Sequence, residues 1–398
     1  MDKITPFPDG NTLVMYNNFA NKLVVGNSCG ILKIFDINQL DLEPQSVDID
    51  ENITNLCCWE NKLLVTNTGG NVEVIDFDNL QSTSKIYRSE LPLRDVIYIN
   101  NGSRILVGGD DNKLVIIDSA SKLTQSISLP DQLVNVAYNF TGEILSLSLS
   151  NGDLQIYSLI NETPSLIHTL SQILPVKIHT SLDSIDYVSQ HKDELVCSKT
   201  LWSTDGQYLI SCNTDNVIQI RNRSNWTQKP KEIASSAKIV DMILIKEFII
   251  TLCSDSTVKI YNLDTLSKVN EIPIDSQDEI LLNLSWNKNT VFVGTTSGNF
   301  YVLNDIIKDQ SSSSKKIDSL FLDEAEESAQ GDDDEDRVND TDALLFDSDD
   351  EVPKPTTTTA NGYRLHEDDS MIIDEDDQFE NDDTGSAYLT RKRHKPNG

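Results

Sequence analysis

Seven similar segments recur along residues 1–305, and their spacing is the feature that most constrains the fold. Each segment closes its second apolar run at an Asp, Ser or Asn, and the steps between these positions are 40, 42, 40, 64, 40 and 42 residues. A repeat of about 40 residues is typical of a four-stranded propeller blade. The sequence therefore predicts seven blades. The closing positions are Asp36, Asp76, Asp118, Ser158, Asn222, Asn262 and Asn304.

Each repeat contains two short aliphatic or β-branched runs joined by a turn. In the first copy, the run Leu23 to Gly26 is followed by the turn Asn27 to Gly30 and by the run Ile31 to Ile37. Asn, Asp, Ser and Gly accept the left-handed backbone conformations of tight hairpins. A four-stranded sheet cannot bury both of its faces alone, so the blades must stack around a channel. We therefore predict an all-β, seven-bladed β-propeller.

Closing the ring requires one more strand, because the seventh repeat ends at Asn304. The segment Lys3 to Pro8 precedes the first inner strand, Thr12 to Asn17, and we expect it to pair as the outer strand of blade 7. The competing segment is Lys316 to Leu322, which is apolar enough to form a strand but follows a run of serines.

The one long step, of 64 residues, indicates an insertion at about 166–193, between blades 4 and 5. An insertion into a propeller leaves the ring at a strand connection and lies on its surface. It is either a neutral loop extension or an interaction element. The second reading is motivated by its apolar residues, which are Ile173, Leu174, Val176, Ile178 and Tyr187.

Composition changes sharply after residue 305. Residues 306–398 contain 27 acidic and 10 basic side chains, a net charge of −17, and include runs of Ser, Thr and Asp. Such a segment buries too little apolar surface to offset its ordering entropy, which predicts a disordered acidic linker or tail. Residues 1–305 are also acidic, with a net charge of −15. This balance disfavours nucleic-acid binding over a broad face of the propeller.

Basic residues gather in the fifth repeat, close to a tryptophan. An Arg and Trp cluster on a propeller face could anchor an acidic peptide or phosphates. The alternative is an ordinary solvated outer strand with a packed tryptophan. The candidate partner-binding residues are Arg221, Arg223, Trp226, Lys229 and Lys231.

The tail carries three further kinds of candidate site. Short apolar motifs flanked by acids could dock on a partner, and an acidic context favours phosphorylation of Ser348. A terminal basic cluster predicts nuclear import, the alternative being a few charges at a disordered end. The docking residues are Leu320, Phe321, Leu322, Leu344, Leu345 and Phe346, and the import residues are Arg391, Lys392, Arg393 and Lys395.

Nothing in the repeats predicts catalysis. The five histidines lie in the insertion and the tail, and the six cysteines form no C-x-x-C pair. We see no His, Cys or carboxylate set at ligand spacing on the channel strands, and no glycine loop for phosphates. We therefore expect a non-enzymatic protein with no metal and no cofactor. No apolar run is long enough to suggest a membrane segment or a signal peptide.

The repeats resemble divergent WD repeats, with Phe35-Asp36, Ile75-Asp76 and Ile117-Asp118 in place of the Trp-Asp pair. The Gly-His pair of that family is missing, so these WD40-like blades should depend on apolar packing. The run from Trp202 to Leu209 together with Arg223 to Trp226 resembles the fifth repeat of the chromosome transmission fidelity factor family. This family is also called acidic nucleoplasmic DNA-binding protein or DNA polymerase alpha-binding protein.

That resemblance implies a replisome adaptor in the nucleus, linking helicase and polymerase alpha primase and supporting sister-chromatid cohesion and DNA repair. The chain would correspond to the N-terminal propeller and acidic linker of such a protein. It would be monomeric, because the family's trimerising second propeller is absent, and any association with chromatin would be indirect. We expect no membrane partner.

Two alternatives remain open from the sequence. A WD-type propeller can serve as a substrate receptor for a cullin ubiquitin ligase, which would bind a cullin adaptor. It can also bind a histone or other peptide tail at its channel, which requires acidic pockets there. The hairpin-turn carboxylates that could form such pockets are Asp110, Asp111, Asp153 and Asp255.

Overall fold

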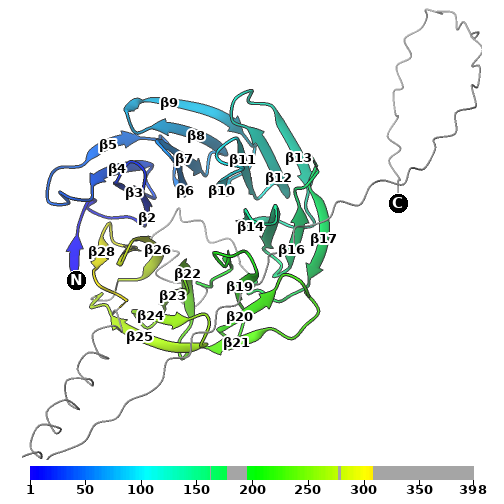
Figure 1. Ribbon diagram of the computed structural model, residues 1–398. Coiled ribbons are helices and arrows are strands. Elements are labelled where there is room, and N and C mark those ends of the chain that lie inside the picture. Colours follow the sequence, from blue (N-terminus) through cyan, green and yellow to red (C-terminus); the bar gives the residue numbers. More distant parts are fainter. Residues whose placement is uncertain (162, 177–194, 277–278, 308–398) are drawn as a thin grey trace, which may run out of the picture. The chain divides into compact units, whose positions relative to one another are not determined.

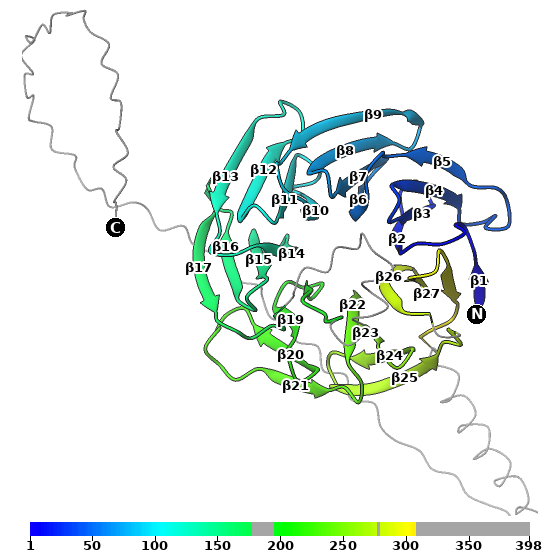
Figure 2. The same cartoon turned by 180° about the vertical axis from the view of Figure 1, so that it is seen from behind.

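The computed structural model describes residues 1–161, 163–176, 195–276 and 279–307. Contacts divide the chain into the units Met1–Ala325 and Glu326–Gly398, and all described residues belong to the first. They form a ring of seven antiparallel sheets with four strands each (Figure 1). Figure 2 shows the same ring from behind. The prediction of an all-β, seven-bladed propeller is confirmed.

The first four blades follow the chain in order, with the first strand of each blade lining the channel. Blade 1 contains β2 (Thr12–Asn17), β3 (Lys22–Asn27), β4 (Ile31–Asp36) and β5 (Gln45–Asp48). Blade 2 contains β6 (Ile53–Trp59), β7 (Lys62–Asn67), β8 (Asn71–Asp76) and β9 (Asn79–Arg88). Blade 3 contains β10 (Leu93–Ile99), β11 (Arg104–Gly109), β12 (Lys113–Asp118) and β13 (Thr124–Ser128). Blade 4 contains β14 (Leu133–Asn139), β15 (Ile144–Leu149), β16 (Leu154–Ser158) and β17 (Ser165–Leu170).

The last three blades complete the ring. Blade 5 contains β18 (Thr200–Trp202), β19 (Tyr208–Cys212), β20 (Val217–Asn222) and β21 (Lys231–Ala234). Blade 6 contains β22 (Ile239–Ile245), β23 (Phe248–Cys253), β24 (Thr257–Asn262) and β25 (Ser267–Pro273). Blade 7 contains β26 (Leu281–Asn287), β27 (Thr290–Thr295) and β28 (Phe300–Leu303), and it takes its outer strand from the N-terminus, β1 (Asp2–Ile4).

The turn between the second and third strands shows why the repeat folds into hairpins. In three blades an asparagine ends the second strand or directly follows it, and its side-chain oxygen accepts the backbone N–H four residues later. The oxygens of Asn27, Asn67 and Asn213 accept at 2.8, 2.9 and 2.9 Å, respectively. This Asx-type bond satisfies a backbone donor that the tight turn would otherwise leave unpaired.

Apolar side chains from neighbouring blades pack against each other and form the core. One cluster joins blades 1 and 2 through Val24, Ile34, Leu63 and Ile75, and another joins blades 6 and 7. The four named residues are at most 3% exposed. Since a single sheet leaves one face uncovered, each blade is stabilised mainly by the next one in the ring.

The ring closes through the N-terminal strand. Strand β1 pairs with β28 in the register Asp2↔Val302, Lys3↔Tyr301 and Ile4↔Phe300. The predicted closing strand, Lys3 to Pro8, was right in location and wrong in extent, because the paired strand is Asp2–Ile4. Prolines at 6 and 8 have no N–H to donate to a ladder, which ends the strand. The competing segment 316–322 lies outside the described residues.

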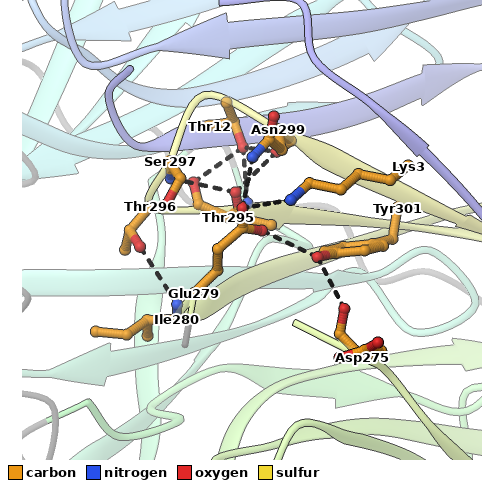
Figure 3. A network of polar contacts seen from close by, with 10 residues as sticks. All are labelled: Lys3, Thr12, Asp275, Glu279, Ile280, Thr295, Thr296, Ser297, Asn299 and Tyr301. Carbon is orange, nitrogen blue, oxygen red and sulfur yellow. Dashed lines mark hydrogen bonds and ion pairs between the residues drawn. The ribbon is translucent and has the colours of Figure 1, made fainter. Parts of the chain in front are cut away.

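Polar side-chain contacts reinforce this closure (Figure 3). The Thr12 hydroxyl of blade 1 donates to the carbonyls of Thr295 and Asn299 of blade 7, at 3.0 and 2.7 Å, and accepts the Thr295 N–H at 2.7 Å. Lys3 forms an ion pair with Glu279 at 2.6 Å, and Tyr301 donates to the same carboxylate at 3.0 Å. The first and last blades are therefore joined by side chains as well as by strand pairing.

The irregular segment between blades 4 and 5 begins later than predicted. Its first residues form β17, the outer strand of blade 4, which pairs with β16. Leu174 is 1% exposed and packs with Leu154 and Leu209, across the boundary between blades 4 and 5. The predicted start at 166 was therefore too early, since the blade needs its fourth strand. Residues 177–194, which make up most of the predicted insertion, lie outside the described residues.

Candidate functional site

One position facing the central channel is polar in six of the seven blades. It lies on the innermost strand or just before it, and it recurs in steps of 40, 40, 64, 42 and 42 residues. In five blades a register shift in the strand pairing directly precedes this residue, and such a bulge redirects a side chain. The residues are Asn55, Asp95, Asn135, Lys199, Asp241 and Asn283. Blade 1 has Leu13 at this position.

These side chains connect neighbouring blades around the channel. Four of them accept the backbone N–H of the next blade's inner strand, so each blade uses its neighbour's polar side chain to satisfy a buried donor. The accepting oxygens and donors are Asp95 with Val136 at 2.6 Å, Asn135 with Thr200 at 3.0 Å, Asp241 with Leu284 at 2.8 Å, and Asn283 with Val14 at 3.3 Å. We call the six residues the channel ring.

Two carboxylates and one lysine give the channel ring its charge. Lys199 forms an ion pair with Asp241 at 3.2 Å. Burial lowers the pKa of Lys199. The nearby negative charges, that of Asp241 first among them, outweigh burial, so the net pKa is raised. Asp95 accepts four hydrogen bonds, two of them from Asn55 and Asn135. Burial nevertheless raises the pKa of Asp95 to about 6.

We expect the Asp95 carboxyl to titrate far above its unfolded value of 3.8. Because protonation then favours the folded state, Asp95 adds stability as the pH falls from about 6 towards 4, and this contribution is absent above the folded pKa. The measurement is carboxyl-carbon NMR of the ¹³C-labelled chain, with Asp95→Asn to assign the signal. A midpoint below 4.5 would contradict the expectation.

A cavity of about 250 Å³ lies within the channel and is lined by five members of the channel ring, Asp95 being the exception. Two carboxylates, Asp95 of blade 3 and Asp241 of blade 6, do lie on the channel strands. Their oxygens are already bonded to backbone amides. Among the described residues, no group of three or more His, Cys, Asp and Glu could hold a metal ion.

The channel ring therefore orients and joins the blades. The sequence did not reveal it as a ligand cluster, because the available signal was a single polar residue two positions after a buried apolar residue in six of the seven repeats. None of the described residues forms a helix with the length and apolarity needed to span a membrane.

The candidate basic cluster of blade 5 does not form one exposed surface. Arg221 is only 7% exposed, and its guanidinium donates to Gln219 at 2.7 Å and to Ser211 at 3.3 Å. Burial lowers the pKa of Arg221. Its position in the repeat is apolar in every other blade, so Arg221 occupies an interior site. The corresponding residues are Phe35, Ile75, Ile117, Tyr157, Tyr261 and Leu303.

The remaining members of the cluster are split between core and surface. Trp226 packs edge-to-face on Trp202, with ring centroids 6.1 Å apart, in the apolar contact of blades 4 and 5. Arg223 has a buried Nη1 without a hydrogen-bond partner. Lys229 and Lys231 are exposed, and Lys231 lies 5.6 Å from the Tyr208 ring centroid. Trp226 is therefore a packed tryptophan, as the alternative to a partner-binding cluster predicted.

Charge reversal at Arg221 is expected to damage the fold. Arg221→Leu should leave stability within about 1 kcal/mol of the native chain, since an apolar residue suits this site and replacing a buried charge by a hydrophobic group is often neutral. Arg221→Glu should cost about 3 kcal/mol, because it buries an unpaired carboxylate. Urea unfolding of the two variants measures the difference. Equal stabilities would show that Arg221 is solvated.

The turn carboxylates proposed for a peptide-tail reader all have partners. Asp110 forms a two-pronged ion pair with Arg94, Asp255 pairs with Lys259 at 3.0 Å, and Asp153 accepts the Gln172 N–H at 2.8 Å. Asp111 accepts from the Ser89 hydroxyl at 3.2 Å. These contacts stabilise the turns and their neighbouring strands.

The candidate sites of the tail lie outside the described residues. They comprise the two docking motifs, each of which combines acidic and apolar residues, the phosphorylation candidate Ser348 and the basic import cluster. They stay predictions, as does the predicted domain boundary at 305.

The ring of blades and its channel define the class of this molecule, a seven-bladed β-propeller. The Cps50 (Swd1) β-propeller domain of Myceliophteria thermophila has the same fold, with a TM-score of 0.58 and 13% identity over 76% of this chain and 98% of that domain. None of the known protein-family models matches the chain.

Two curated proteins are similar in sequence. The DNA polymerase alpha-binding protein of Saccharomyces cerevisiae is 24% identical over 99% of this chain and 48% of its own length. Minichromosome loss protein 1 of Schizosaccharomyces pombe is 23% identical over 80% of this chain and 40% of its own length. The similarity to the DNA polymerase alpha-binding protein confirms the resemblance that the fifth repeat indicated. The chain spans about half the length or less of these relatives.

Proposed function

We propose that this protein is a non-enzymatic interaction scaffold of the nuclear DNA replication machinery. The observation that carries the proposal is the similarity to the DNA polymerase alpha-binding protein across 99% of this chain. The propeller supports it physically, because a rigid ring of blades presents loops on two faces for partners. The polar contacts of the channel ring hold neighbouring blades in fixed positions, and a docking platform requires such a rigid surface.

The finer parts of this proposal are the partners and processes. The protein would link the helicase to polymerase alpha primase at the fork and support sister-chromatid cohesion and DNA repair. It would reach chromatin through proteins, since the net charge of −32 opposes direct binding to DNA over a broad surface. The chain alone would be monomeric.

Affinity purification from nuclear extract tests the adaptor role. The full chain and residues 1–310 are compared at physiological salt after nuclease treatment, with bound proteins identified by mass spectrometry and folding checked by circular dichroism. We expect polymerase alpha and other fork proteins on both. Recovery of a cullin adaptor in place of fork proteins, or no specific protein on either chain, would refute the proposal.

Nuclear import is tested separately. Replacing Arg391, Lys392, Arg393 and Lys395 with alanine should move a fluorescently tagged chain from the nucleus to the cytoplasm, because import receptors read short basic runs. Unchanged nuclear fluorescence would remove the import role from this cluster.

A further inference from the structure

A large concave surface of the propeller lies along the boundary of blades 6 and 7. It is a groove of about 1170 Å³ that extends from Met15 and Tyr16 of blade 1 to the outer strand of blade 6. Its wall includes two partly exposed apolar side chains, Trp286 (40% exposed) and Val269 (37%). An apolar wall next to charged residues is a typical surface for an amphipathic segment.

The groove carries positive charge on an otherwise acidic protein. Lys246 and Lys288 occupy equivalent positions in the turns between the inner and second strands of blades 6 and 7, and both line the groove. Both residues have a left-handed backbone, with φ of 53°, in a tight hairpin turn. The corresponding turns of the other five blades contain no lysine or arginine. Three lysines line the groove beside one acid, Glu247. Lys199 is already paired with Asp241, which leaves Lys246 and Lys288 as the lysines at the blade 6 and 7 turns.

The chain itself leaves the propeller at the edge of this groove. After β28, the backbone N–H of Ile307 donates to the Asn289 side chain at 2.8 Å, and the Asn289 amide donates back to the Ile307 carbonyl at 3.0 Å. Asn270 on β25 donates to the Ile306 carbonyl at 3.0 Å. Asn289 and Ile307 both line the groove. The position from which the following residues start is therefore fixed.

We propose that the groove binds the chain's own acidic and apolar segment at residues 318–327, DSLFLDEAEE. Leu320, Phe321 and Leu322 would contact the apolar wall around Trp286. The segment's five carboxylates would be attracted to Lys246 and Lys288. The groove thus holds an internal ligand that an external acidic and apolar peptide must displace.

The tether makes this segment a better occupant than the similar motif at 342–351. Leu320 lies thirteen residue steps beyond Ile307, which can extend up to about 45 Å and is ample for a groove that begins at Ile307. A short flexible linker gives an effective concentration on the order of 1 mM. If the isolated segment binds with a Kd of about 0.1 mM, the tethered copy weakens binding of a free copy about tenfold.

The test uses a fluorescein-labelled peptide with the sequence of residues 316–327, titrated into the full chain and followed by anisotropy. The release variant carries Leu320→Ala, Phe321→Ala and Leu322→Ala, and its matched control carries Leu344→Ala, Leu345→Ala and Phe346→Ala. We expect the peptide to bind the release variant about tenfold more tightly than the native chain. The control variant should behave like the native chain.

A second pair of variants locates the binding surface. In the release variant, Lys246→Glu with Lys288→Glu should weaken peptide binding at least about tenfold, because charge attraction turns into repulsion. Lys229→Glu with Lys231→Glu, an exposed lysine pair on blade 5, should leave it unchanged. Equal binding to the native chain and the release variant, no binding to the release variant, or indifference to the blade 6 and 7 lysines would each overturn the proposal. This test needs no replication protein, so it can fail while the adaptor role holds.

Discussion

Asp241→Ala is expected to destabilise the propeller by about 2–4 kcal/mol, because it removes the acceptor of two buried backbone N–H groups and one half of an ion pair. Asp241 joins three blades. Its carboxylate accepts Lys199 of blade 5 at 3.2 Å and the Leu284 N–H of blade 7 at 2.8 Å. The substitution leaves the lysine unpaired in the channel and two backbone amides without an acceptor, the second being that of Met242. Urea unfolding followed by tryptophan fluorescence measures the loss.

Two companion variants interpret the Asp241 result. Adding Lys199→Met to Asp241→Ala should recover part of the lost stability, because the unpaired charge is removed. Asp215→Ala, on an exposed turn, should change stability by no more than about 0.5 kcal/mol. A loss below 1 kcal/mol for Asp241→Ala would mean that the channel ring does not hold the blades together.

Deleting residues 1–4 should open the ring and cost about 3 kcal/mol, from the lost ladder hydrogen bonds at roughly 1 kcal/mol each and the lost Ile4 packing. The deletion also exposes the edge of β28, which can pair with another chain. We therefore expect a lower unfolding temperature together with concentration-dependent association. Differential scanning calorimetry and analytical ultracentrifugation measure the two effects.

The matched control for this deletion is Lys3→Ala. It removes the ion pair with Glu279 and keeps the backbone pairing of β1. Because Lys3 is 35% exposed at its side chain, the loss should be below about 1 kcal/mol. If Lys3→Ala costs as much as the whole deletion, the ion pair rather than the strand closes the ring.

The repeat period made the fold predictable. Seven closing positions in steps of about 40 residues correspond to seven sheets, because hairpin chemistry is local and a turn such as Asn27 to Gly30 is determined by its own residues. The same reasoning placed the N-terminal segment on blade 7. It could not give the register, since the pairing of Lys3 with Tyr301 depends on residues almost three hundred positions apart.

The candidate sites were predicted less well, because composition does not reveal whether a side chain points into the core or into solvent. Arg221 has the residue type of a surface cluster, yet it occupies a position that is apolar in the other repeats and faces the interior. The residue type suggested a ligand, and aligning the repeats would have indicated burial. The channel ring, by contrast, was not predicted. Its Asn and Asp residues are isolated in the sequence and form no motif until the closed ring brings them together.

The sequence by itself determined the number of blades, their hairpins, the acidic balance and the family resemblance. These follow from local periodicity and composition. Only the tertiary structure decided which polar side chains meet across blades, where Arg221 lies, and that Lys246, Lys288 and Ile307 share one groove. The physical reason is that blades contact each other through residues about 40 or more positions apart, and the packing of such residues is decided by the closed ring as a whole.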